Sequence, residues 1–235
     1  GDTSNVALKV NGSVVAWGNA DSGGDTSNVA EQLTGDVQVI TSNRAAFAAL
    51  KLNGSVVAWG GEGGNTSLVA DQLQDGVKEI IANSTAFAAL KVSGSVVAWG
   101  AARDGGSTHP VASQLRNGVQ TVCSTDCGAF AALKSDGSVI PWGSLHKPMC
   151  MGSTGQASRF GDQLDDGVQA ICGGSRAFAA LKVNGSVVTW IPRAQAVRHC
   201  GRWPPCDGLD DGVLSISSGS GMIMAVKSDG SVVVW

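Results

Sequence analysis

One pattern of hydrophobic and polar positions recurs six times along the chain. Two short apolar runs flank a turn, as in the stretch Ala46-Phe-Ala-Ala-Leu-Lys-Leu-Asn-Gly-Ser-Val-Val-Ala-Trp-Gly60. A further apolar strand, Val37-Gln-Val-Ile40 in the second copy, precedes every hairpin except the first. The turn glycines lie 40 to 48 residues apart, a period that marks a repeat architecture; they are Gly12, Gly54, Gly94, Gly137, Gly185 and Gly230. The pattern predicts an all-β chain with roughly three antiparallel strands per repeat.

The turn of each repeat predicts a register. Asn53-Gly54 between two apolar runs is typical of a two-residue type I′ turn, in which both residues adopt φ > 0. The pairs expected from that turn are Leu50–Val57, Ala49–Ala58 and Ala48–Trp59. Since side chains alternate between the faces of a sheet, Leu50, Val57, Ala48 and Trp59 would form a bulky face and the other two alanines a flat one.

Both faces of the hairpin are apolar, so both must be buried, which a lone hairpin cannot do. A ring of hairpins can, with the Trp face of each blade on the alanine face of the next. We therefore predict a β-propeller of six blades, or six blades of a seven-bladed ring. An open β-solenoid is the alternative. Pro141 in the Trp-bearing strand of the fourth repeat predicts that this strand is an edge strand.

We expect a single domain over residues 1–235. We expect the first blade, residues 1–18, to be truncated because it lacks the preceding strand; residues 1–7 repeat the sequence of residues 24–30. The connectors after each Trp-Gly predict a tight turn and one helical turn, as in Val29-Ala-Glu-Gln-Leu33, with the leucine packed inward.

Two connectors are longer, at residues 144–161 and 191–208. They follow consecutive repeats and should lie side by side on one rim, where long loops on a rigid scaffold often carry function. Arginine and tryptophan are favoured anchors in interfaces. The partner-binding residues predicted in these insertions are His146, Lys147, Arg193, Arg198, Arg202 and Trp203. The alternative is a solvated loop pinned by a disulfide.

Charge, hydropathy and cysteine content limit the kinds of partner and compartment that the sequence predicts. A net charge of −3 argues against general nucleic-acid binding, which needs a basic surface. There is no apolar run of 18 residues, so no transmembrane segment is expected. An even number of cysteines is compatible with disulfides and favours an oxidising compartment, lumenal or secreted. Free buried thiols and a metal site are alternatives. The candidates are Cys123, Cys127, Cys150, Cys172, Cys200 and Cys206.

The sequence carries no catalytic or phosphate-binding motif. His109 stands beside Pro110 in a connector and is expected on the surface. The pairs Asp165-Asp166 and Asp210-Asp211 both precede Gly-Val at the start of a strand, which favours a turn role over acid–base chemistry. We predict that the protein is not an enzyme and that it needs no cofactor and no metal.

The repeat Ala-Phe-Ala-Ala-Leu-Lys-x-x-Gly-Ser-Val-Val-x-Trp-Gly resembles the RCC1 (regulator of chromosome condensation) repeat over about nine-tenths of the chain. It is most similar to short variants with three-stranded blades, as in algal RCC1-like proteins. The resemblance implies a propeller that binds macromolecules, as guanine-nucleotide exchange factors, ubiquitin-ligase accessory domains and protein inhibitors of this family do. The connector Gly-Gly-Asp-Thr-Ser replaces the family's Gly-Gln-Leu-Gly, and no functional residue is transferred.

Together these observations predict a non-enzymatic protein–protein interaction scaffold. A specific form is an extrinsic accessory subunit of a larger assembly, such as a photosynthetic membrane complex, whose partners are other protein subunits. The alternative is a regulatory domain, either a guanine-nucleotide exchange factor or a ubiquitin-ligase accessory domain.

Overall fold

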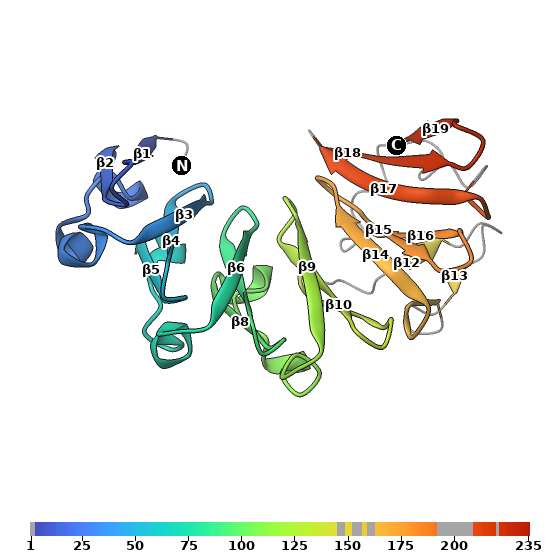
Figure 1. Ribbon diagram of the computed structural model, residues 1–235, viewed down its shortest axis with the longest axis horizontal. Coiled ribbons are helices and arrows are strands. Elements are labelled where there is room, and N and C mark those ends of the chain that lie inside the picture. The colour runs from blue at the N-terminus through green and yellow to red at the C-terminus, as the bar shows by residue number, and fades with distance from the viewer. Residues whose placement is uncertain (1–2, 145–148, 152–156, 159–162, 192–208, 220) are drawn as a thin grey trace. The chain divides into compact units, whose positions relative to one another are not determined.

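The computed structural model describes residues 3–144, 149–151, 157–158, 163–191, 209–219 and 221–235, and these form two compact units, Gly1–Asn117 and Gly118–Trp235 (Figure 1). No helix in these ranges is long and apolar enough to cross a membrane. Each unit is a series of small antiparallel sheets joined by connectors.

The first unit holds three sheets, with strand orders β1-β2, β3-β4-β5 and β6-β7-β8. The first sheet has two strands, in keeping with the missing inner strand of the first repeat. The strands are β1 Ser4–Leu8, β2 Val14–Gly18, β3 Val37–Ser42, β4 Ala46–Lys51, β5 Val56–Gly60, β6 Val77–Ala82, β7 Ala86–Lys91 and β8 Val96–Gly100.

The second unit holds sheets of order β9-β10-β11, β14-β15-β16 and β17-β18-β19, and the middle sheet gains β12 and β13 at the β16 edge. The strands are β9 Val119–Thr125, β10 Ala129–Lys134, β11 Val139–Gly143, β12 Met149–Met151, β13 Ala157–Ser158, β14 Val168–Gly173, β15 Phe178–Lys182, β16 Val187–Ile191, β17 Val213–Gly219, β18 Met222–Lys227 and β19 Val232–Val234. As predicted, Pro141 lies in an edge strand, β11.

The connectors form short 3₁₀ helices, as the repeated text predicted. In the first unit they are η1 Ala20–Ser22, η2 Ser27–Leu33, η3 Glu62–Gly64, η4 Ala70–Leu73, η5 Ala102–Asp104 and η6 His109–Val111. The connector leucines, Leu33, Leu73, Leu115, Leu164 and Leu209, are all buried, so each pins its connector to the core.

The predicted hairpin register is wrong by one residue. The observed pairs are Leu50–Val56, Ala49–Val57, Ala48–Ala58 and Phe47–Trp59. The cause is the turn, which has three loop residues: the amide of Gly54 donates to the carbonyl of Lys51, and the amide of Lys51 donates to the carbonyl of Ser55. Gly54 has φ +78° while Asn53 keeps a negative φ. This is a type I turn closed by a glycine bulge, and one extra loop residue shifts every pair.

The correct register changes the two faces of the sheet. Phe47 and Trp59 lie opposite each other on the bulky face and stack at a centroid distance of 5.4 Å. Ala46, Ala48 and Ala58 share the other face. The same stacked pair recurs as Phe87–Trp99, Phe130–Trp142 and Phe178–Trp190.

The predicted packing of aromatic faces on alanine faces is confirmed within each unit, in the opposite order. Phe87 and Trp99 of the third sheet pack on Ala46 and Ala48 of the second, so the aromatic face covers the preceding sheet. In the second unit, Phe178 and Trp190 pack on alanines of β10, and Ile223 and Trp235 pack on Ala177 and Ala179. Small residues on one face and large rings on the other let consecutive sheets interlock.

The indole nitrogens are also anchored in the first unit. Nε1 of Trp59 donates to the carbonyl oxygen of Gly23 at 3.0 Å, and Nε1 of Trp99 donates to that of Gly63 at 2.9 Å. A Cβ on Gly23 would lie 2.7 Å from the Phe47 ring, and one on Gly63 would lie 2.6 Å from the Phe87 ring. These connector glycines are therefore required for the ring to pack beneath the connector.

Candidate interaction surface

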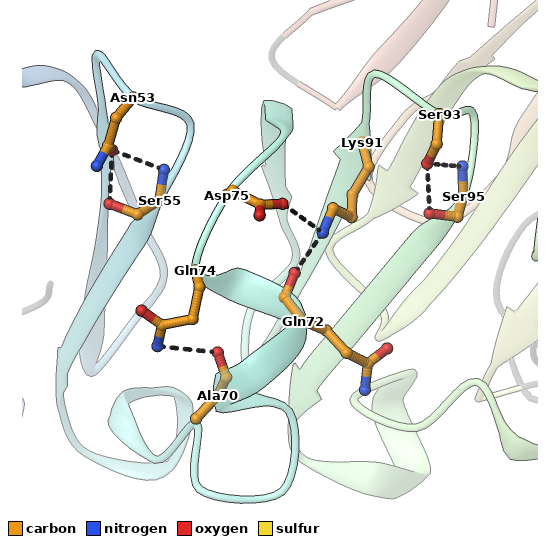
Figure 2. A network of polar contacts seen from close by, with 9 residues as sticks. All are labelled: Asn53, Ser55, Ala70, Gln72, Gln74, Asp75, Lys91, Ser93 and Ser95. Atoms are coloured by element: carbon orange, nitrogen blue, oxygen red, sulfur yellow. Dashed lines mark hydrogen bonds and ion pairs between the residues drawn. The ribbon is translucent and has the colours of Figure 1, made fainter.

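The hairpin turns are the most regular polar feature of the molecule. In the second sheet the side-chain oxygen of Asn53 accepts hydrogen bonds from the amide and the hydroxyl of Ser55, and Ser93 and Ser95 make the equivalent contacts in the third sheet. Figure 2 shows both turns on the same side of the unit. Asx-type side chains hydrogen-bond the backbone two residues on, which holds the turn without help from the core.

Where aspartate replaces asparagine, the turn carries a charge. Oδ1 of Asp136 accepts hydrogen bonds from the hydroxyl and the amide of Ser138, and these bonds hold the pKa of Asp136 below its ordinary value. Asp229 and Ser231 repeat the arrangement, with the pKa of Asp229 lowered for the same reason.

A ladder of main-chain hydrogen bonds ties successive turns together in the first unit. Its rungs are Val37 N–H to Gly12 O, Leu52 N–H to Asp36 O, Val77 N–H to Gly54 O and Val92 N–H to Gly76 O, at 2.8 to 3.0 Å. The first and second turns are therefore each held to the start of the next sheet, and the second and third turns are also held to the start of their own sheets. The turns form one ordered surface, not three independent loops.

Aliphatic side chains stand on this ladder and point into solvent. We call Val10, Leu52 and Val92 the tip row; each directly precedes the Asn-Gly or Ser-Gly of its turn, and each is at least 70% exposed. They contribute little to the core. The same position in the second unit carries Ser135, Val183 and Ser228. The fold thus accepts serine here, so the aliphatic character of the tip row is not a folding requirement.

A cleft of about 860 Å³ lies in the first unit between the connector that follows β5 and the one that follows β8. Its titratable side chains are Glu62 and His109, and its walls also include Leu68 and Gln72. The volume is in the range of ligand sites. Its walls are the two connectors together with Ala98, Trp99 and Gly100 of β8, and the polar side chains around it offer hydrogen-bond donors and acceptors.

The residues predicted from the insertions cannot be compared with the structure. His146, Lys147, Arg193, Arg198, Arg202 and Trp203 lie outside the described residues. What is described of the first insertion is backbone: β12 pairs with β16 through Met149–Ile191, Cys150–Trp190 and Met151–Thr189. Those loops stay predicted partner sites. The sequence analysis missed the tip row, although its signal, an aliphatic residue inside a turn motif, was visible.

The other candidate side chains take ordinary places. His109 is exposed in η6, as expected. Asp166 and Asp211 lie in bends just before β14 and β17, 3.6 Å from Lys182 Nζ and 3.8 Å from Lys227 Nζ respectively, in keeping with the predicted turn role. Within the part of the chain that the structure describes, no three His, Cys, Asp or Glu residues gather to hold a metal ion.

Three of the six cysteines are described in full, and all three are free thiols: Cys123, Cys127 and Cys172. Burial raises the pKa of Cys123 well above its ordinary value, with a smaller contribution from Cys172, and burial raises the pKa of Cys172 to about 11. Both thiols are therefore protonated at neutral pH and poorly reactive in the folded chain.

Solved structures share this architecture. No protein-family model matches the sequence, and no curated protein matches it. The CRINKLY WD40 ectodomain of the Arabidopsis thaliana receptor kinase ACR4 aligns at 15% identity and TM-score 0.52, covering 100% of this chain and 78% of that one. Yeast RCC1 (Prp20), solved bound to Kap60, aligns at 17% identity and TM-score 0.52, covering 100% and 68%.

The fold is an RCC1-type β-propeller. Human WBSCR16 supports the same conclusion at 15% identity and TM-score 0.52, covering 99% of this chain and 74% of that one. The predicted fold class is thus confirmed. At these identities the RCC1-type likeness concerns the fold alone. A further structure of Prp20p from Saccharomyces cerevisiae is described with its binding to Gsp1p and histones, which are properties of that protein.

Proposed function

We propose that this RCC1-type propeller is a non-enzymatic protein-interaction domain and that a partner protein docks on the tip row. The observation that carries the proposal is the exposure of Val10, Leu52 and Val92 on a hydrogen-bonded ladder. These aliphatic side chains offer apolar surface that a partner can cover, and their ordered backbone lowers the entropy cost of covering it.

The repeat supplies its own matched variants for a test. Serine occupies the tip position in two hairpins of the second unit, and Ser135 keeps the rung to Gly118 O at 2.8 Å. The triple variant V10S/L52S/V92S should therefore fold with unchanged circular dichroism and a melting temperature within about 2 °C of the wild type. The control V183S changes the same position in the second unit.

Tagged wild type, V183S and the triple variant would be incubated with an extract of the source cells, and bound proteins would be quantified by mass spectrometry. We expect one or a few proteins to be retained by the first two chains and reduced at least tenfold with the triple variant. Each would then be purified and its direct binding measured. Equal retention by all three chains would remove the tip row as the docking site, and no retention by any of them would contradict the proposal itself.

A finer version of the proposal makes the chain an extrinsic accessory subunit of a larger assembly, such as a photosynthetic membrane complex. The cysteine content and the algal resemblance of the repeat support it. Co-migration of the chain with that complex on native gels is the expected result. The regulatory alternative, nucleotide exchange or ubiquitin-ligase assistance, predicts faster nucleotide release from a small GTPase or co-purification with a ligase.

A further inference from the structure

One residue beside the tip row has a strained backbone conformation, at a position where the other repeats have glycine and therefore no strain. Asp36 has φ +64° and is the only non-glycine residue with positive φ in the ranges that the structure describes. The other repeats place glycine there: Gly76, Gly118, Gly167 and Gly212, with φ of 64° to 72°. A side chain in this region costs stability, and such outliers often mark functional positions.

Asp36 stands between the first two members of the tip row. A Cβ on Gly12 would lie 2.8 Å from the Asp36 amide nitrogen, and the Leu52 amide donates to the Asp36 carbonyl at 2.8 Å. Its exposed carboxylate therefore belongs to the same surface as Val10 and Leu52.

Asp75 directly precedes Gly76, the counterpart of Asp36, and lies between the second and third turns. Figure 2 shows Asp75 and Lys91 between the turn of Asn53 and the turn of Ser93. Each pair of neighbouring tips thus has a carboxylate between its members.

The lysines that precede Leu52 and Val92 are turned inward. Nζ of Lys51 donates to the carbonyl of Gln32 at 2.9 Å, and Nζ of Lys91 donates to that of Gln72 at 2.8 Å. The Lys91 side chain is 18% exposed, whereas that of Asp75, its ion-pair partner at 3.4 Å, is 82% exposed. Beside Leu52 and Val92 the charges that face solvent therefore include the carboxylates of Asp36 and Asp75, while Lys9 beside Val10 is exposed.

The unit that carries the tip row is also the more acidic of the two. Residues 1–117 contain 10 acidic and 7 basic side chains, which gives −3, and residues 118–235 contain 9 of each. The whole net charge of the protein thus lies in the unit that carries the tip row. A negative net charge makes this unit a poor match for nucleic acid or anionic lipid.

We propose that the tip row binds a basic amphipathic segment of a partner protein, whose aliphatic side chains cover Val10, Leu52 and Val92 while its lysines or arginines meet Asp36 and Asp75. This inference rests on the proposed function and specifies the chemistry of the partner. Apolar contact supplies affinity, and the carboxylates select the sign of the partner's charge.

The test uses fluorescence anisotropy with the full chain and labelled synthetic peptides of 18 residues. The probe has leucine and lysine at amphipathic spacing; one comparison peptide replaces leucine by serine, and another replaces lysine by glutamate. We expect the leucine–lysine peptide to bind at least tenfold more tightly than either. V10S/L52S/V92S should weaken its binding at least tenfold, and V183S should leave it unchanged.

Asp36→Gly separates charge from folding, because glycine is the residue of the other repeats. It should raise the melting temperature while weakening peptide binding about threefold at 0.1 M salt, with the difference shrinking at 0.5 M salt, where charges are screened. A purely structural Asp36 would change the melting temperature alone.

Three results would overturn the inference. They are equal binding of the lysine and glutamate peptides, unchanged binding by the triple variant, and self-association in sedimentation that the triple variant abolishes, which would make a second copy the occupant. If the peptides fail but the triple variant still loses a cellular protein, only the partner chemistry is wrong and the interaction proposal stands.

Discussion

Residues 12–18 and 54–60 have the same sequence, Gly-Ser-Val-Val-Ala-Trp-Gly, and form the same half of a hairpin in the first and second sheets. The strands have the same register, yet Trp17 is 51% exposed and Trp59 is 4% exposed. Opposite Trp17 stands Asn5, and opposite Trp59 stands Phe47, which stacks on it. The same local sequence thus forms the same strand in both sheets, but its tryptophan is buried in only one of them.

The neighbours explain the difference. Trp59 packs toward Val6 and Val14 of the first sheet, and its indole N–H is bonded to the Gly23 carbonyl. Among the residues described in the first unit, no sheet packs on the Trp17 face of the first sheet, which leaves Trp17 half-exposed. Strand formation is encoded in each repeat, whereas core formation is a property of two consecutive repeats.

The largest test of this comparison is to remove the two tryptophans separately. Trp59→Ala should destabilise the chain by about 3 to 5 kcal/mol, since it deletes a buried stacked ring. Trp17→Ala changes the same residue in the same sequence context and should cost about 1 kcal/mol or less. Urea unfolding followed by intrinsic fluorescence or circular dichroism measures both. Similar losses for the two variants would mean that the first sheet has a covered face.

A smaller effect is expected at the turn glycines. Gly54 and Gly230 both have positive φ, so alanine at either should cost about 1 to 2 kcal/mol of backbone strain. A Cβ on Gly54 would also lie 2.8 Å from the Gly76 amide nitrogen, whereas one on Gly230 meets nothing within 4 Å. Gly54→Ala should therefore be the more destabilising variant, by roughly 1 to 3 kcal/mol. Equal melting temperatures for the two variants would contradict the rigid ladder.

The smallest effect concerns the charge in the turns. The pKa of Asp136 is lowered in the folded chain by the Ser138 hydrogen bonds. The ionised form therefore stabilises the fold above about pH 4, the unfolded value, and that contribution is lost as pH falls through the folded pKa. Asp136→Asn restores the residue of the second hairpin, where Asn53 makes the same bonds without a proton.

The stability of Asp136→Asn should thus fall less steeply than that of the wild type between pH 5 and pH 3, as measured by urea unfolding at several pH values. An Asp136→Ala variant is the control, because it removes the hydrogen bonds at every pH. A steeper fall for Asp136→Asn than for the wild type would reverse the assigned sign.

Much of the fold could be predicted from the sequence because the apolar runs of each repeat indicate its strands and the glycine between them indicates its turn. The register could not, because Asn-Gly permits both a two-residue turn with two positive φ angles and a three-residue turn with one. The packing order of the aromatic and alanine faces depends on that register and on the neighbouring sheet. The sequence of a single repeat determines neither.

The beginning of the chain shows the same limit more sharply. The text Ser-Asn-Val-Ala occurs at residues 4–7 in strand β1 and again at residues 27–30 in the 3₁₀ helix η2. In the first place it pairs with β2, and in the second it leads to the buried Leu33. The partner within reach decides the conformation, so propensity alone could not.

The candidate site was predicted less well than the fold. Sequence analysis favoured the long insertions because they depart from the repeat, and overlooked the tip row because it conforms to the repeat. Only the burial of each position showed that the residue before Asn53-Gly54 lies outside the core. Exposure is a tertiary property, and an aliphatic residue in a β-rich repeat is ordinarily assigned to the interior.

The hydrogen bonds between successive turns join main-chain amides and carbonyls only, so they do not depend on the side chain at the tip of each turn. Recognition and folding are therefore uncoupled at these positions: a single substitution can change what the surface prefers and leave the scaffold as it was. A lineage of such proteins could acquire new partners by altering one residue per repeat, while the rest of the repeat is preserved.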